Sequence, residues 1–357
     1  MTKAASRPLD VLVIDDSAVV RQSMAAVLAR RAGTSVSAAS DALIGLRKIR
    51  ERRPDVIVLD LELPKMDGLT FLRKLMAEDP IPVVVCSTLA GPGTEAAIRA
   101  LEEGAVEVIH KPTLGARQFI EESVTQVIDA VEAAFASRLV RRSPRPAPPA
   151  FTKLPLLRNT TGRVIAIGAS TGGTEAIREI LESMPPDAPG TVLVQHMPEQ
   201  FTAAFAARLD QLCRIEVREA RQGDRVTEGL ALIAPGNHHL RLLRSGAHYL
   251  VEVTSDPPVS RHRPSVDVLF QSVAAAAGPN AVGALLTGMG DDGADGLLSM
   301  LRAGASTFAQ DEASCVVFGM PREAILRGAA QHVVPLSRMA EALRGAASRL
   351  RGRHSPV

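Results

Sequence analysis

Short runs of β-branched residues alternate with amphipathic stretches along most of the chain, and this alternation limits the fold more than any other feature. Between residues 11 and 136 the pattern repeats five times. The expected strands cover residues 11–14, 35–39, 56–59, 83–86 and 106–109. The expected helices cover residues 18–31, 42–52, 68–78, 94–103 and 117–136, with Ser40 placed to cap the second and Gly33 and Gly104 near the ends of others. Such a succession predicts a parallel sheet with helices on both faces.

The same alternation resumes after residue 163. Strands are expected at 164–167, 191–194, 282–286, 305–309 and 332–334. Helices are expected at 175–183, 202–209, 266–277, 294–303, 322–327 and 338–350. Between them, residues 229–233 and 239–253 are typical of β-hairpin segments, with Ser245-Gly246 as the turn. We therefore expect a second, doubly wound and mostly parallel α/β domain that carries a hairpin.

The segment between the two patterned regions has a different composition. Residues 138–162 contain no acidic residue and are rich in proline and arginine. This composition predicts a semi-extended tether with no core of its own. It is either a passive spacer or a segment that steers the domains or meets an acidic partner. The predicted organisation is a first domain at 1–137, a linker at 138–162 and a second domain at 163–357.

Charge and cysteine content restrict the possible partners and the compartment. The chain has 41 basic and 39 acidic residues, so its charge alone implies neither a nucleic-acid nor a membrane partner. Cys86, Cys213 and Cys315 are widely spaced, as expected for reduced thiols. No stretch approaches the ~20 apolar residues of a membrane span, and residues 1–10 do not resemble a signal peptide. We predict a cytoplasmic protein without direct membrane insertion.

Polar residues follow the expected strands of the first domain. They are Asp15, Asp16, Asp60, Ser87 and Lys111. Carboxyl ends of parallel strands meet at one edge of a sheet, where ligands collect. Three carboxylates there suit a hard cation such as Mg²⁺ and leave one of them able to attack a phosphoryl group. The lysine and the hydroxyl would then hold the phosphoryl oxygens.

A glycine turn opens the second domain. Residues 168–172 spell G-x-S-x-G between an expected strand and an expected helix, and they leave the hydroxyl of Ser170 at the turn. This serine could be a nucleophile, a helix cap or part of a cradle for a dinucleotide phosphate. A dinucleotide fold usually ends its next strand with Asp or Glu, but here that strand leads into His196.

A third expected strand leads into a glycine-rich loop, residues 287–293, that contains Asp291 and Asp292. Ser170, His196 and one of these aspartates thus follow three strands that we expect to be parallel. The histidine can accept the serine proton, and a carboxylate can orient the imidazole. Spacing does not decide between the aspartates. The order Ser, His, Asp also differs from the Ser, Asp, His order of α/β-hydrolases.

Residues 8–136 resemble the receiver domain of bacterial response regulators. The acidic pair of that family falls on Asp15 and Asp16, and its phospho-acceptor falls on Asp60, within residues 59–68. Its switch hydroxyl falls on Ser87 and its lysine on Lys111. The resemblance implies a flavodoxin-like (βα)5 fold, Mg²⁺ at the three aspartates and phosphorylation of Asp60 by a chemotaxis histidine kinase.

The receiver resemblance has two further consequences. It implies a cis peptide bond between Lys111 and Pro112. Receivers often carry Tyr or Phe three residues before the lysine, where this chain has Val108. Coupling through an aromatic side chain at that position is therefore not expected.

Residues 163–350 resemble the catalytic domain of the chemotaxis protein-glutamate methylesterases. The family nucleophile falls on Ser170, its base on His196 and its acid on Asp292, while the amide of Met289 matches the oxyanion donor. Residues 234–239 and 263–270 match further motifs. Thr171, beside the serine, and His262 are additional candidates for the oxyanion site or substrate cleft.

The two resemblances together imply a phosphorylation-activated serine esterase that hydrolyses glutamate methyl esters on methyl-accepting chemotaxis receptors. They also imply deamidation of receptor glutamines, no cofactor for the esterase chemistry, and an unphosphorylated receiver that covers the active-site edge. The alternative is a non-enzymatic response regulator whose second domain binds a nucleotide or a protein.

Overall fold

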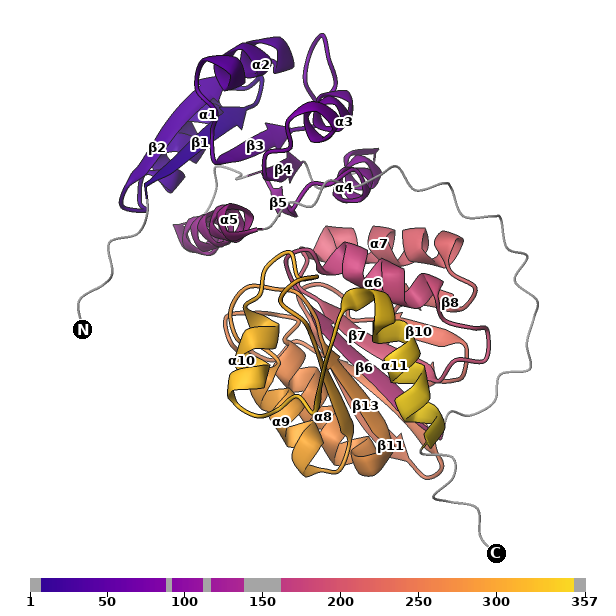
Figure 1. Ribbon diagram of the computed structural model, residues 1–357. Helices are drawn as coiled ribbons and strands as arrows, with labels where there is room; N and C mark the ends of the chain where they lie inside the picture. The colour runs from indigo at the N-terminus through magenta and orange to yellow at the C-terminus, as the bar shows by residue number, and fades with distance from the viewer. Residues whose placement is uncertain (1–7, 88–91, 112–116, 138–161, 350–357) are drawn as a thin grey trace, which may run out of the picture. The chain divides into compact units, whose positions relative to one another are not determined.

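The computed structural model describes residues 8–87, 92–111, 117–137 and 162–349 (Figure 1). The chain divides into two compact units, Met1–Pro144 and Arg145–Val357. Most of the predicted linker and the predicted cis bond at Pro112 lie outside the described residues. The domain boundaries at residues 137 and 162 therefore stay predictions.

The described part of the N-terminal unit contains a five-stranded parallel sheet in the order β2-β1-β3-β4-β5. Its strands are β1 (Leu9–Ile14), β2 (Thr34–Ala39), β3 (Val56–Asp60), β4 (Val83–Ser87) and β5 (Glu107–His110). Its helices are α1 (Ala18–Leu28), α2 (Ala42–Glu51), α3 (Gly68–Glu78), α4 (Pro92–Glu102) and α5 (Arg117–Ala136). This strand order is that of a flavodoxin-like sheet, so the predicted (βα)5 fold is confirmed.

The start of α2 corrects one local prediction. Asp41, and not Ser40, caps this helix: its carboxylate accepts a hydrogen bond from the amide of Ile44 at 2.8 Å. The same carboxylate pairs with Lys65 Nζ at 2.7 Å. The carboxylate is the better cap here, because it accepts from the helix start and pairs with an ammonium, whereas a hydroxyl could only cap the helix. At two other helix ends, Gly33 (φ 78°) and Gly104 (φ 108°) adopt the expected left-handed backbone.

The described part of the C-terminal unit contains a seven-stranded sheet in the order β15-β14-β13-β6-β7-β10-β8, and all its neighbouring strands run parallel. These strands are β6 (Val164–Ala169), β7 (Gly190–Gln195), β8 (Glu216–Glu219), β10 (Leu230–Ile233), β13 (Ala281–Leu285), β14 (Ser306–Gln310) and β15 (His332–Val334). The helices are α6 (Gly173–Glu182), α7 (Glu199–Leu212), α8 (Val266–Ala277), α9 (Ala294–Arg302), α10 (Met320–Leu326) and α11 (Leu336–Arg349), with a short 3₁₀ turn at Gly278–Asn280. The predicted doubly wound α/β domain is confirmed.

Helices cover both faces of this sheet (Figure 1). On one face α6 contacts α7 and α11, and on the other α9 contacts α8 and α10. The central strands β6 and β7 are buried along their whole length because they are covered from both sides. Their apolar side chains pack with those of β13 and α8 into one core.

The hairpin prediction was right for one segment and wrong for the other. β11 (His239–Ser245) and β12 (His248–Thr254) form an antiparallel pair, extended by β9 (Arg225–Val226). Ser245 still pairs with His248, so the turn is Gly246-Ala247, one residue later than predicted. Residues 229–233 do not belong to this hairpin. All four side chains of β10 are buried, and the strand lies in the parallel sheet between β7 and β8.

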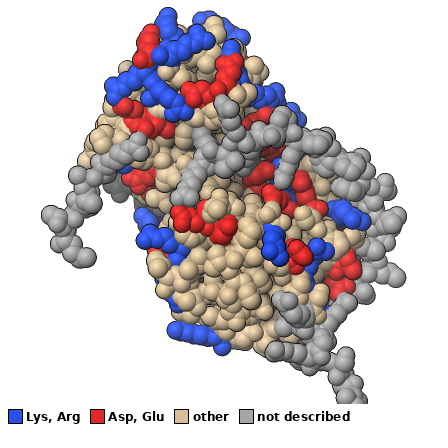
Figure 2. Space-filling view, viewed as in Figure 1, with Lys and Arg blue, Asp and Glu red and all other residues tan. Residues whose placement is uncertain are grey.

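Basic and acidic side chains both occur on the visible face of each unit, and a broad part of that face of the C-terminal unit is uncharged (Figure 2). This distribution agrees with the nearly balanced composition of the chain. Cys86, Cys213 and Cys315 are buried free thiols, as predicted. Across the part of the chain that the structure describes, no helix is long and apolar enough to cross a bilayer.

Candidate functional site

The site of the C-terminal unit lies where the strand order reverses. The chain enters the sheet at β6, adds β7 on one side, and later adds β13 on the other. Ligands of such sheets bind beyond the carboxyl ends of the strands at this switch point. Ser170 follows β6, His196 follows β7, and the loop with Asp292 follows β13. The prediction that these three side chains share one edge of one sheet is confirmed.

The turn after β6 is held by backbone contacts. The amide of Ser170 donates to Thr287 O at 3.0 Å, and Ser170 O accepts from the amide of Gly173 at 2.7 Å. Gly172 has a φ of 77°, which favours glycine. A Cβ on Gly288 would lie 2.7 Å from the Cβ of Ser170, so the loop after β13 can approach the serine only because residue 288 is glycine.

His196 and Asp292 form the central hydrogen bond of the site. Nε2 of His196 lies 2.8 Å from Oδ2 of Asp292. Burial raises the pKa of Asp292, but the hydrogen bond and charge of His196 and two backbone amides outweigh it and bring the pKa to about 2. An ionised carboxylate only accepts, so Nε2 carries a proton, and in the neutral imidazole Nδ1 then holds the lone pair. Nδ1 is buried and has no hydrogen-bond partner within the described residues.

The structure also distinguishes the two aspartates of the loop after β13. Asp291 is 59% exposed at its side chain and pairs with Arg327 Nη2 at 2.7 Å. Asp292 is 1% exposed at its side chain and contacts His196. Sequence spacing left this choice open, because it depends on contacts with distant residues.

His262 lies against the same edge of the sheet. Its ring stacks on that of His196, with centroids 3.8 Å apart and planes 10° apart. A tight turn presents it, in which Ser260 (φ 51°) and Arg261 (φ 67°) both adopt the left-handed region. Burial, together with the positive charges of His196 and Arg261, lowers the pKa of His262 to about 3 despite the opposing charge of Asp292. His262 is therefore neutral near pH 7.

Gln195 is a site residue that the sequence analysis did not single out. Its Nε2 donates to Ser170 O at 2.9 Å and to His196 O at 3.0 Å, so one amide ties together the two segments. A Cβ on Gly173 would lie 2.2 Å from Gln195 Oε1. The available signal was an amide side chain at the carboxyl end of a buried and mostly apolar strand.

Met289 and Thr171 were the other candidates beside the serine. Within the described residues, the amide of Met289 has no hydrogen-bond acceptor, whereas that of Gly288 donates to Val317 O at 3.0 Å. Thr171 is buried, and its carbonyl accepts from Thr287 Oγ1 at 3.0 Å. Thr171 follows Ser170 in the chain, and Met289 follows Gly288, which lies against Ser170; the roles of both residues stay predictions.

A second polar cluster lies at the carboxyl edge of the N-terminal sheet. Carboxylate oxygens of Asp15, Asp16 and Asp60 lie within 4.8 Å of one another. Lys111 Nζ donates to Asp60 Oδ2 at 2.7 Å and lies 3.3 Å from Asp15 Oδ2. Ser87 is buried at the end of the strand next to β3. The predicted convergence of these side chains on one edge is confirmed.

The electrostatics of this cluster suit a hard cation. Burial is the main cause that raises the pKa of Asp15, whose buried Oδ2 forms an ion-pair contact with Lys111 but, among the described residues, accepts no hydrogen bond. Burial alone would lower the pKa of Lys111, but Asp60 and Asp15 outweigh it and raise that pKa. A carboxylate oxygen without a hydrogen bond, beside two more carboxylates, fits a divalent cation with oxygen ligands.

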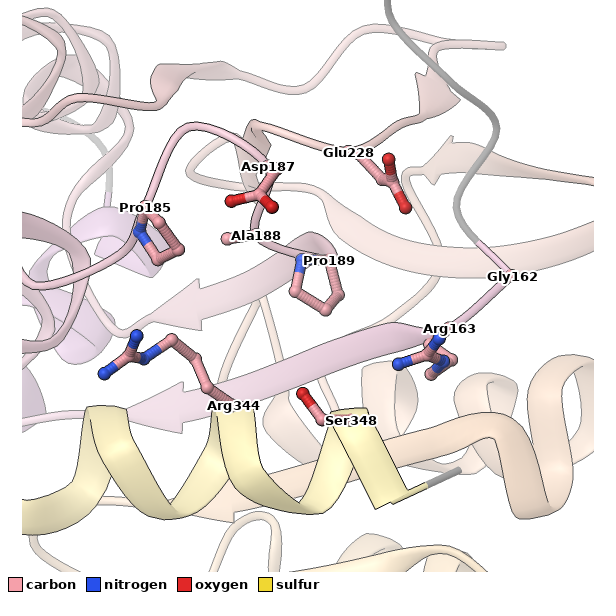
Figure 3. Close-up of a pocket in the computed structure, with 9 residues that line it drawn as sticks. All are labelled: Gly162, Arg163, Pro185, Asp187, Ala188, Pro189, Glu228, Arg344 and Ser348. Atoms are coloured by element: carbon pink, nitrogen blue, oxygen red, sulfur yellow. The ribbon is translucent and has the colours of Figure 1, made fainter. Parts of the chain in front are cut away.

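A small pocket elsewhere in the C-terminal unit is not part of the serine site (Figure 3). Arg163 precedes β6, Pro189 precedes β7 and Glu228 precedes β10, and all three line the pocket with Arg344 of α11. These residues mark the amino ends of the parallel strands. The pocket therefore lies at the edge of the sheet opposite Ser170.

Comparisons with known proteins find matches for both parts of the chain. The family model of the CheB methylesterase matches residues 165–343, and that of the response regulator receiver domain matches residues 11–123. A relative from Anaeromyxobacter dehalogenans, named protein-glutamate methylesterase/protein-glutamine glutaminase 1, is 58% identical over 343 residues, which cover 93% of this chain and 97% of the relative. A relative from Geobacter metallireducens, named protein-glutamate methylesterase/protein-glutamine glutaminase 3, is 55% identical over 346 residues. These residues cover 94% of this chain and 98% of the relative.

Among solved structures, the CheB methylesterase catalytic domain of Thermotoga maritima is similar, with a TM-score of 0.51 and 35% identity. It covers 52% of this chain, and 99% of that domain is matched. The sequence similarity extends over nearly the whole length of these relatives. It includes both regions of this chain that the family models match. The chain therefore belongs to the protein-glutamate methylesterase/protein-glutamine glutaminase family, with a receiver domain ahead of its methylesterase domain.

Proposed function

We propose that this protein is a phosphorylation-controlled serine esterase that hydrolyses methyl esters of glutamate side chains on chemoreceptors. One observation supports this most strongly. His196 donates from Nε2 to the ionised Asp292, while its buried Nδ1 has no partner within the described residues, at the sheet edge that carries Ser170. An oriented imidazole with a free lone pair is what activation of a serine hydroxyl requires.

In the first half of the reaction, Ser170 Oγ bonds to the ester carbonyl carbon and His196 Nδ1 takes the hydroxyl proton. Asp292 stabilises the imidazolium that forms. The amide of Met289, on the loop that packs against the Cβ of Ser170, is the proposed donor to the oxyanion. The bond from carbon to the methoxy oxygen then breaks, and the imidazolium returns its proton so that methanol leaves.

In the second half, His196 Nδ1 takes a proton from water, whose oxygen attacks the acyl carbon. The bond to Ser170 Oγ breaks, the serine regains a proton, and the glutamate carboxylate is released. A glutamine side chain forms the same acyl-enzyme with ammonia as the leaving group, so one site serves both activities. These steps need no cofactor.

The receiver cluster is the proposed control site. Asp15, Asp16 and Asp60 would hold Mg²⁺, which offsets the negative charge of an incoming phosphoryl group. A chemotaxis histidine kinase is the proposed phosphodonor and Asp60 the acceptor. Lys111, which already contacts Asp60, and the hydroxyl of Ser87 would bind the phosphoryl oxygens. We place these events in the cytoplasm.

The names of the relatives support the esterase and not the alternative of a non-enzymatic binding module. The strand end after β7 agrees, since it carries a histidine bound to a carboxylate where a dinucleotide fold would place a ribose-binding acid. Neither of these observations favours a nucleotide ligand for the glycine turn.

Methanol release from methylated receptor, with and without a phosphoryl donor, tests the proposal. We expect release by the wild-type chain, stimulation by the donor, and loss of release in Ser170→Ala with phosphorylation of Asp60 intact. A serine-directed organophosphonate should add its mass at Ser170 and should fail to label Ser170→Ala. Full hydrolysis by Ser170→Ala would refute the mechanism.

A further inference from the structure

The acid of the proposed triad is also bound by the start of a neighbouring helix. Oδ2 of Asp292 accepts from the amide of Val266 at 2.7 Å, and Oδ1 accepts from the amide of Asp267 at 3.0 Å. Ser265 Oγ, which caps α8, donates to Oδ1 at 2.8 Å. Four hydrogen bonds, including that from His196, thus fix the carboxylate, and three of them come from the N-terminus of α8.

Within the described residues, no side chain of its own segment caps the start of the second helix of this pair. The N-cap of α9 is Gly293, which has no side chain to accept a hydrogen bond. Asp267, in the first turn of α8, serves in its place, because its Oδ1 accepts from the amide of Gly296 at 2.7 Å. Each of the two helix starts is therefore bound by an aspartate from the other segment.

Close packing fixes the start of α8 against the start of α9. A Cβ on Gly296 would lie 2.7 Å from the Cβ of Phe270 and 3.0 Å from the Cα of Asp267. A Cβ on Gly293 (φ 94°) would lie 2.5 Å from Cγ1 of Val266. The two helices can approach this closely only with glycine at both positions.

We propose that Asp267 is a positioning residue for the esterase: by capping α9 from α8, it holds the loop that presents Asp292 to His196. Asp292 lies two residues before the start of α9, so a shift of that helix start displaces its carboxylate. This inference rests on the proposed esterase function. It goes beyond the triad because Asp267 contacts neither His196 nor Ser170 in any hydrogen bond that the described residues form.

The cap from Asp267 has a cost in folding free energy, because its carboxylate is buried. Only 6% of the residue is exposed. Burial is the main cause that raises the pKa of Asp267 to about 6, with added repulsion from Asp292 and Asp295. A buried carboxylate next to another costs folding free energy near pH 7. A residue kept at such a cost is expected to serve the geometry of the site.

Three variants of the full-length chain test the proposal. Asp267→Ala removes the cap, Asp267→Asn keeps an acceptor for the amide of Gly296 without the charge, and Asp295→Asn is the matched control. Asp295 lies in the same first turn of α9 and is 64% exposed at its side chain, where it pairs with Arg327. We expect Asp267→Ala to lower kcat by about tenfold to a hundredfold with little change in KM, since misplacement by ~1 Å has effects of that size. Asp267→Asn should recover most of the loss, and Asp295→Asn should match the wild type.

A second readout does not depend on activity. The His196 Nε2 proton, held between nitrogen and a carboxylate, should give a low-field proton resonance in the wild type and in Asp295→Asn. In Asp267→Ala, measured below its melting temperature, that resonance should shift or broaden. If Asp267→Ala melts earlier but keeps wild-type kcat and an unchanged resonance, Asp267 is only a structural cap and the inference fails. If Ser170→Ala is as active as the wild type, the proposed function fails instead, whatever the resonance shows.

Discussion

The imidazole ring of His262 lies flat on that of His196, with ring centroids 3.8 Å apart. The low pKa of His262, about 3, keeps this partner uncharged while His196 gains and loses a proton. A neutral ring can support the orientation of His196 without repelling the imidazolium that the mechanism requires.

Replacement of this ring should change how stability depends on pH. Unfolding raises the pKa of His262 from about 3 towards 6.5, so between these values the unfolded state binds more protons. The free energy of unfolding therefore rises with pH across this window and falls on acidification. We expect His262→Phe, which keeps the stacking area, to lose less stability than the wild type between pH 7.5 and 4.5, by on the order of 1–2 kcal/mol. Urea unfolding of the C-terminal domain at both pH values measures this, and equal losses would contradict it.

The tautomer of His196 depends on the charge of Asp292. Asp292→Asn replaces an acceptor-only group with one that also donates, and its amide would face the donors of Val266, Asp267 and His196. We expect kcat to fall by about 10⁴-fold, as in other serine triads. Asp291→Asn is the control, because its side chain faces Arg327 at the surface. Steady-state methanol release compares the two, and a similar small effect in both would remove Asp292 from the mechanism.

The side-chain amide of Gln195 links the backbones of Ser170 and His196, the proposed nucleophile and base. Gln195→Ala would leave Ser170 O and His196 O without this donor. We expect kcat to fall by about tenfold or more, because geometry at both reacting groups loosens. Gln211→Ala, at an exposed position of α7, should leave kcat unchanged. Gly173→Ala, whose new Cβ would displace Gln195 Oε1, should reproduce the loss.

Control by the receiver is testable by truncation. If the unphosphorylated receiver restrains the esterase, removal of residues 1–140 should raise basal methanol release. The phosphoryl donor should then stimulate the full chain and leave the truncated chain unchanged. A truncated domain no faster than the unphosphorylated full chain would count against inhibition by the receiver.

The sequence predicted the position of a site residue well where that residue directly follows a strand. Ser170, His196 and Asp60 follow apolar runs whose direction and burial are local properties, so their shared edges followed from the parallel topology. The aspartate of the loop after β13 could not be chosen from the residues alone. Arg327 binds one candidate and the start of α8 binds the other, and both contacts are long-range.

The other incorrect or missing predictions have equally specific causes. Ser40 and Asp41 are adjacent cap candidates, and the ion pair with Lys65 that distinguishes them is tertiary. Residues 230–233 have a fully apolar run that suits either sheet, and only the assembled fold places them between β7 and β8. Asp267 looks like an ordinary acidic residue in the first turn of a helix until the packing of α9 against α8 is known.

The hydrogen bond between His196 and Asp292 joins residues 96 positions apart. Synthesis therefore adds the proposed nucleophile and base well before it adds α8 and the proposed acid that α8 binds. A nascent chain that ends between His196 and Asp292 would therefore lack the proposed acid, and the proposed hydrolysis could start only late in synthesis. We therefore expect a product that stops before residue 292 to release no methanol, whatever the state of the receiver.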